Sequence, residues 1–185
     1  MRRVYGVLLS VLVLFSLACG FLGRASAPPE AEQLEPVPVS EEAAQQFSEK
    51  LKQAQAVQAD ETVTLTFTEE EVTSFIALNM PSEESGIENL QVHFRDGRIY
   101  ITGSVKVGPS TQKLFVKIRP SVENGQVALE FEEATLGPIS LPDPIKELIS
   151  EQVLAAFNTD NQRAEIKSIR VDEGSITIES VIRGQ

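Results

Sequence analysis

Few side chains in this 185-residue sequence could do chemistry, and none falls into a recognised catalytic arrangement. His93 is the one histidine, so it can complete neither a Ser-His-Asp triad nor a histidine-rich metal cluster. Cys19 is the one cysteine, which excludes an internal disulfide and argues against a thiol enzyme. The residue types therefore predict a protein that is not an enzyme and that holds no metal or cofactor.

The remaining titratable residues have plain structural explanations. His93 lies on the polar side of a predicted strand, where we expect it to be solvated. The run from Glu69 to Glu71 begins a predicted helix, where negative charge suits the helix dipole. Three further glutamates lie on the outer face of another predicted strand: Glu130, Glu132 and Glu133. We expect them to be solvated, and a weak contact with Ca²⁺ is the alternative.

A local group of cations is predicted on neighbouring strands of a strongly acidic protein, whose formal net charge is -11. Its members are Lys106, Lys113, Lys117 and Arg119. They either contact a lipid headgroup or pair across strands with Glu130 and Glu132. The acidic protein as a whole repels polyanions, so we expect no nucleic-acid partner.

The N-terminus has the pattern of an export signal. Residues 1–18 carry Arg2 and Arg3, then an apolar run, then a small residue before Cys19. The ending from Ser16 to Cys19 resembles a bacterial lipobox, although Ser16 and Leu17 stand in swapped order. The resemblance implies a lipidated Cys19 that anchors the protein in the cell membrane, facing outside the cytoplasm. The alternatives are an uncleaved signal anchor and plain secretion, and both also place the domain outside the cytoplasm.

The rest of the chain divides into a tether and one domain. Residues 19–39 contain four prolines and no apolar period, which predicts a flexible acidic linker after the lipidated cysteine. Residues 40–185 then form a single domain of ordinary size. A thin apolar stripe between Ser40 and Gln58 predicts a helix at the start of the domain. A strand is predicted over 61–68, and the capping box from Thr68 to Glu71 predicts the start of a second helix.

Alternating segments joined by turn residues fill most of the domain. Asp96-Gly97, Glu123-Asn124-Gly125 and Asp172-Glu173-Gly174 each predict a turn between paired strands. Gly103 predicts a bulge in its strand, and the alternation places Phe115, Lys117 and Arg119 on an outward face. The segment 136–157 interrupts the strands with an amphipathic helix, whose apolar residues recur at spacings of three and four: Ile145, Leu148, Ile149, Val153 and Phe157. The predicted class is α+β, with a curved, mostly antiparallel sheet wrapped around or packed on this long helix and with N-terminal helices.

Four motifs occur in an order that resembles a known family. They are TFTEEEVTSFI at 66–76, DG-x-I-x-I-x-G at 96–103, ENG-x-V-x-L at 123–129 and G-x-x-x-LP at 137–142. The set resembles bacterial exported proteins of the YpmS-like and LmeA-like groups. The resemblance covers Ser40 to Ile182 and implies a fold similar to tubular lipid-binding (TULIP) domains. In these domains a curved sheet encloses a helix and leaves an apolar groove for phospholipid.

The first functional hypothesis is therefore a membrane-anchored lipoprotein that binds a phospholipid or another apolar ligand. The candidate groove residues are Phe75, Ile76, Leu148, Ile149, Val153 and Phe157. The alternative for each residue is that it only fills the core. A second hypothesis is a non-catalytic envelope adaptor that docks a protein partner through its acidic surface and its first helix. An enzyme would need an Asp/Glu pair that the sequence does not place.

Overall fold

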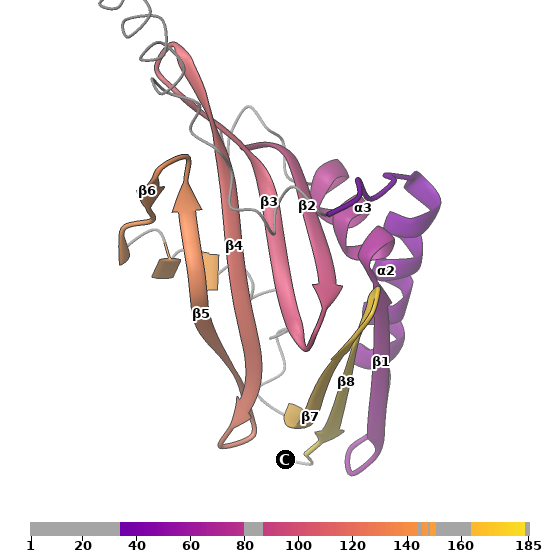
Figure 1. The fold of residues 1–185 in the computed structure, drawn as a ribbon. Coiled ribbons are helices and arrows are strands. Elements are labelled where there is room, and N and C mark those ends of the chain that lie inside the picture. The colour runs from indigo at the N-terminus through magenta and orange to yellow at the C-terminus, as the bar shows by residue number, and fades with distance from the viewer. Residues whose placement is uncertain (1–33, 80–86, 144–145, 148, 151–163, 184–185) are drawn as a thin grey trace, which may run out of the picture.

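The structure is a computed structural model that describes residues 34–79, 87–143, 146–147, 149–150 and 164–183. These residues form two antiparallel sheets and the helices α2 (Glu41–Gln55) and α3 (Glu69–Asn79), with a further helical stretch from Asp143 (Figure 1). The larger sheet has the order β2 (Ile87–Arg95), β3 (Arg98–Val107), β4 (Ser110–Glu123), β5 (Gln126–Leu136) and β6 (Ile139–Ser140). The smaller sheet has the order β1 (Thr62–Thr68), β8 (Ser175–Ile182) and β7 (Ala164–Asp172).

The predicted α+β class with mostly antiparallel strands is confirmed. The predicted long helix is described only in part, because Ile145, Leu148, Val153 and Phe157 lie outside the described residues. The Lys146 N–H donates to the Pro142 carbonyl at 3.2 Å, which is the spacing of a first helical turn. Ile149 packs against the hydrophobic core from this stretch. The length of the helix stays a prediction.

Hairpin turns form where the sequence predicted them. Asp96 and Gly97 both have positive φ, 51° and 73°, and Asn124 and Gly125 repeat this at 54° and 77°. Two successive residues of positive φ match the twist of antiparallel strands, and glycine adopts that conformation without steric cost. These two turns fix the β2–β3 and β4–β5 pairings.

One bulge differs from its predicted position. Gly103 on β3 was expected to form a bulge, but the extra residues lie on β2, between Glu88 and Gln91. Gly103 faces them, and a Cβ there would come within 3.3 Å of Ile87 and 3.4 Å of the Glu88 carbonyl. Glycine is therefore used at 103 because the bulged partner strand approaches its backbone closely.

The first helix is part of the core. Ser40 caps α2 as predicted, because its Oγ accepts the Ala43 N–H at 3.2 Å. Phe47 of α2 is buried, and its ring centroid lies 4.7 Å from that of Phe67 on β1 and 4.5 Å from that of Phe75 on α3. These three rings join α2, β1 and α3 into one apolar contact.

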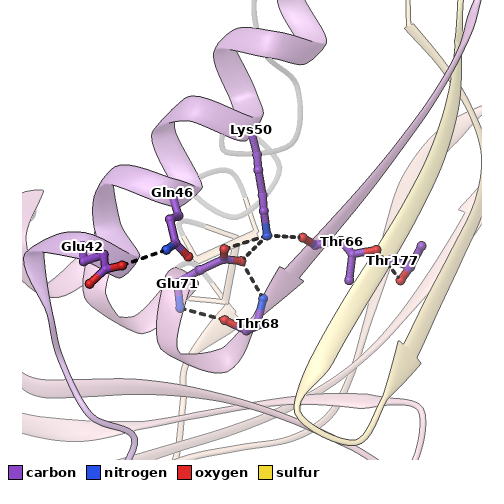
Figure 2. A network of polar contacts seen from close by, with 7 residues as sticks. All are labelled: Glu42, Gln46, Lys50, Thr66, Thr68, Glu71 and Thr177. Carbon is purple, nitrogen blue, oxygen red and sulfur yellow. Dashed lines mark hydrogen bonds and ion pairs between the residues drawn. The ribbon is translucent and has the colours of Figure 1, made fainter.

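A buried carboxylate reinforces the same junction. Glu71 of α3 forms the predicted capping box, accepting the Thr68 N–H at 2.9 Å while the Thr68 Oγ1 accepts the Glu71 N–H at 3.2 Å (Figure 2). Lys50 of α2 places its Nζ 2.6 Å from Glu71 Oε1 and donates to the Thr66 carbonyl at 2.7 Å. Burying a carboxylate is costly unless it is paired and hydrogen-bonded, and Glu71 has both kinds of partner.

The buried face of α3 is more polar than predicted. Val72, Phe75 and Ile76 are partly buried and pack against the core, whereas Leu78 is 51% exposed. The fully buried side chains of α3 are Glu71, Thr73 and Ser74. Each has a different polar partner: Thr73 bonds to the backbone of β2, Glu71 caps its own helix and pairs with Lys50, and Ser74 accepts the Ser40 N–H.

Side chains of α3 and the β7–β8 turn complete the hydrogen bonding of β2. Thr73 Oγ1 accepts the Val92 N–H at 3.0 Å and donates to the Val92 carbonyl at 3.3 Å. Glu69 Oε1 accepts the Phe94 N–H at 2.6 Å, and the Gly174 N–H donates to the Phe94 carbonyl at 2.9 Å. The outer edge of β2 is thus covered rather than left open to pairing with another chain.

We predict that Thr73→Val destabilises the protein by about 2 kcal/mol, because valine keeps the shape but leaves the Val92 N–H and carbonyl buried and unpaired. Thr66→Val is the matched control: Thr66 is exposed and its hydroxyl bonds to that of Thr177 at 3.0 Å in an exposed pair, so its cost should stay within about 0.5 kcal/mol. Urea unfolding measures both. Equal costs would show that the β2 edge does not depend on Thr73.

Candidate functional site

The structure brings three of the six groove candidates to one hydrophobic cluster. Phe75, Ile76 and Ile149 are partly buried and pack against it. Phe75 also stacks on Phe47, so this side chain belongs to the core between α2 and α3. Leu148, Val153 and Phe157 lie outside the described residues, as does Cys19. A groove along these six residues stays a prediction.

The larger sheet has a second face that the core does not use. Its core face carries Val92, Ile101 and Val116, which belong to the hydrophobic cluster. On the opposite face, here called the second face, Tyr100 lies between His93 and Lys117 in the strand register, and Phe115 lies between Thr102 and Thr135. Residues directly opposite in antiparallel strands share a face, so these six side chains form one surface.

The centre of the second face is buried. His93 is 1% exposed, Phe115 1% and Tyr100 6%, although neither Tyr100 nor Phe115 belongs to the core cluster. The two rings lie 6.2 Å apart between centroids. Around these residues, both faces of the larger sheet are therefore buried.

Two sequence-based expectations are wrong here. His93 was predicted to be solvated, and Phe115 was predicted to point outward into water. The alternation placed both on the correct face, but that face is also buried. Ile99 to Ile101 and Leu114 to Val116 are uninterrupted apolar triplets, and such runs are typical of strands buried on both sides. These apolar triplets, rather than the alternation of polar and apolar residues, indicate that the second face is buried.

His93 is held as a neutral imidazole. Burial and, to a lesser extent, the neighbouring Arg95 guanidinium together lower the pKa of His93 from 6.5 to about 4. A neutral imidazole offers one donor and one acceptor. Among the residues that the structure describes, neither ring nitrogen has a hydrogen-bond partner, and Thr135 Oγ1 is likewise buried without one. Unpaired buried polar groups are rare in native proteins, so both require an explanation.

Three cations surround one carboxylate at the margin of the second face. Arg98 Nε lies 2.6 Å from Glu132 Oε2, Lys117 Nζ lies 4.0 Å from the same oxygen, and Arg119 pairs with Glu132 Oε1. The hydrogen bond from Arg98 is the main reason that the pKa of Glu132 is lowered, and that of Arg98 is raised by the same bond. Cross-strand pairing with Glu132 is confirmed for Lys117 and Arg119.

A bulge on β5 creates this cluster. Lys117 lies opposite Glu133 and Ile118 lies opposite Phe131, so Glu132 is the extra residue between them. A bulge re-aims a side chain, and this one directs Glu132 toward Arg98 and Arg119. Lys106 and Lys113, the other predicted members of the group, lie toward the opposite end of the same strands and are exposed.

A shallow pocket of about 290 Å³ lies at the other side of β2. Residues 35–38, Glu69, Glu70, Arg95 and Gly174 line it. Three of these lining side chains are carboxylates, so it is unsuited to an acyl chain. Metal binding has no support within the described ranges, where no three His, Cys, Asp or Glu side chains converge. None of the helices that the structure describes is long and apolar enough to cross a membrane.

Comparison with known proteins agrees with the family resemblance. The model of the LmeA-like phospholipid-binding family matches residues 31–180, which is most of the chain. The protein belongs to this family of phospholipid-binding proteins. No curated protein and no solved structure gave a significant match.

We predict that part of the stability of the protein is lost as the pH falls from about 6.5 to about 4, because of His93. Its pKa is lower in the folded state than the ordinary value, so the unfolded chain binds the proton more strongly and acid favours unfolding. Above pH 6.5 both states hold a neutral His93 and this effect vanishes. Urea unfolding of the wild type and His93→Phe at several pH values measures it. The variant should lose this pH dependence, and identical slopes would contradict the prediction.

Proposed function

We propose that the protein binds a phospholipid outside the cytoplasm, at the surface of a membrane to which Cys19 anchors it. The observation that carries the lipid-binding role is the family match over residues 31–180. Three of the six groove candidates, Phe75, Ile76 and Ile149, pack against one hydrophobic cluster, as an apolar ligand site along these residues requires.

The way the chain enters the domain limits how far an anchored domain could lie from the membrane. The Val37 N–H donates to Gln91 Oε1 at 3.4 Å, and the Val37 carbonyl accepts from Gln91 Nε2 at 3.3 Å. Ser40 follows with a bond from its N–H to Ser74 Oγ at 3.0 Å. Residues 37–40 are thus attached to β2 and α3. The stretch between Cys19 and this attachment spans at most about 60 Å when fully extended, so a lipidated Cys19 would keep the domain near the membrane.

The adaptor hypothesis is less well supported than lipid binding. It rests on the acidic surface and on the thin apolar stripe of the first helix. Phe47 of α2 is buried between Phe67 and Phe75, and Lys50 pairs with Glu71, so α2 is part of the folded core. An enzyme is also disfavoured, because the role of the family is lipid binding and suggests a non-catalytic protein.

We predict that the full chain, purified from bacterial membranes in a mild detergent, retains one phospholipid per protein molecule. Native mass spectrometry would show the bound mass, and solvent extraction would identify the lipid class. A chain denatured and refolded in lipid-free detergent should regain the lipid from phosphatidylglycerol vesicles. A protein that carries no lipid in either preparation would contradict the proposed function.

We predict that Cys19 carries the acyl chains. Cells fed an alkyne-bearing fatty acid should label the wild type, and Cys19→Ser should remove the label, because this sequence offers no second thiol. Ser16→Ala is the control, since a small residue is retained there and labelling should persist. An unlabelled wild type, or equal labelling of Cys19→Ser, would overturn the anchor.

A further inference from the structure

The hairpin of β3 and β4 projects beyond the rest of the larger sheet. β2 begins at Ile87, opposite Val105, and β5 ends at Leu136, opposite Leu114. Residues 106–111, here called the hairpin tip, therefore have no neighbouring strand on either side among the described residues. Figure 1 shows the tip extending past the ends of β2 and β5. Every residue of the tip is exposed, so it contributes little to the core.

The turn of the hairpin tip is apolar. Val107 and Ser110 form the last pair of the hairpin, and Gly108 and Pro109 connect them. Val107 is 48% exposed, which makes it one of the few large apolar side chains exposed in the described part of the chain. A single exposed valine is ordinary on a protein surface. This valine differs because it lies at the end of a projection and close to two cations.

The two cations are Lys106 and Lys113, which lie on the second face. Lys106 is opposite Thr111, and Lys113 follows two residues later on β4, so the two lysines are diagonal neighbours. Both are exposed, and neither forms an ion pair among the described residues. Lys117 and Arg119, further along β4, instead pair with a carboxylate of β5. Of the four cations predicted on these strands, Lys106 and Lys113 are therefore the two left for a ligand.

The sequence around the tip lacks negative charge. The chain has 27 acidic residues, yet residues 97–122 contain none. In the strand register the first carboxylate away from the tip is Glu88, which pairs with Ser104 below the tip. Two lysines against one glutamate leave a net positive charge at this end of the described sheet. The tip therefore has the opposite sign to the protein as a whole, whose formal net charge is -11.

An anionic lipid surface matches these features. Lysine side chains lay their aliphatic stems along apolar surface while the ammonium groups reach polar partners such as lipid phosphates. Each lysine near an anionic bilayer strengthens the attraction about fivefold, and a small apolar tip enters the headgroup layer. The same bilayer repels the acidic protein as a whole, which directs the tip toward it. A stable protein partner would need about 800 Å² from each side, more than this short tip offers.

We propose that the hairpin tip docks the domain on an anionic lipid surface, with Lys106 and Lys113 at the lipid phosphates and Val107 in the headgroup layer. This inference rests on the membrane location in the proposed function and adds an orientation to it. The β3–β4 end of the larger sheet faces the bilayer, and the β4–β5 turn at Asn124 faces away. The lipidated Cys19 attaches the protein, and the tip sets its direction.

The direct test measures which end of β4 contacts the bilayer. Thr111→Cys and Ser121→Cys are each labelled with an environment-sensitive fluorophore in the full chain, which is reconstituted in phosphatidylglycerol vesicles. Both positions are exposed, and they lie about 33 Å apart on one strand. Quenching by brominated lipid should be strong at Thr111 and absent at Ser121. The wild type, whose one cysteine is Cys19, gives the background labelling.

Charge removal tests the two lysines. In the Thr111→Cys protein, Lys106→Gln/Lys113→Gln should lower the quenching by about threefold or more, because two attractions of about fivefold each are lost. The matched control is Lys52→Gln/Lys167→Gln, which removes two exposed lysines from α2 and β7. This control should be quenched like its parent. Vesicles of phosphatidylcholine, which have no net charge, should give weak quenching at Thr111.

Each outcome separates the docking tip from the proposed function. Equal quenching at Thr111 and Ser121 would overturn the docking tip, whatever lipid the protein retains. Quenching that is unchanged by Lys106→Gln/Lys113→Gln, or equal in phosphatidylcholine, would overturn the role of the lysines. A label at Thr111 that is shielded in native membranes but not in vesicles would assign the tip to a protein partner instead. A protein that docks through its tip but retains no lipid in native mass spectrometry would contradict lipid binding alone.

Discussion

The outer edge of β2 is the constraint on which the rest of the structure depends. One side of this strand pairs with β3, so the backbone groups of Val92 and Phe94 on the other side need partners inside a folded protein. Thr73 and Glu69 supply them from α3, and Gly174 supplies one from the β7–β8 turn. One strand edge thereby joins α3 and the smaller sheet to the larger sheet. The Glu71–Lys50 pair then brings α2 to the same side.

This assembly determines which face of the larger sheet packs in the hydrophobic core. Phe47 of α2, Phe67 of β1 and Ile176 of β8 belong to the same hydrophobic cluster as Val92 and Val116. The second face takes no part in that cluster, yet its centre at His93 and Phe115 is buried. It carries buried polar atoms of His93 and Thr135 that have no hydrogen-bond partner among the described residues, and such groups cost stability.

Local signals in the sequence were sufficient for the elements and their turns. Asp96-Gly97 predicts its hairpin because few residues other than Asn, Asp and Gly accept positive φ, and the Thr68 to Glu71 capping box predicts the start of α3. The polar contacts of α3 were not predictable in this way. Thr73 reads as an ordinary helical residue until β2 lies beside it, and that contact joins residues nineteen positions apart.

The candidate site shows the same limit more strongly. The two-residue alternation of a strand assigns each side chain to one of two faces, but it does not show whether the second face is exposed to solvent. His93 was therefore placed on the correct side of β2 and given the wrong environment. Lys117 and Arg119 were recognised as a group, whereas Arg98 joins them only through the bulge that directs Glu132 toward it. The burial of His93 and the grouping of Arg98, Lys117 and Arg119 around Glu132 emerge only in three dimensions.

Amide hydrogen exchange on β2 is the most direct measurement of the central claim, which is that contacts from α3 close the outer edge of this strand. The account predicts that the Val92 and Phe94 amides exchange as slowly as amides paired within the larger sheet, and that Thr73→Val speeds exchange at Val92. Exchange of both amides in the wild type at the rate of an exposed loop would contradict it.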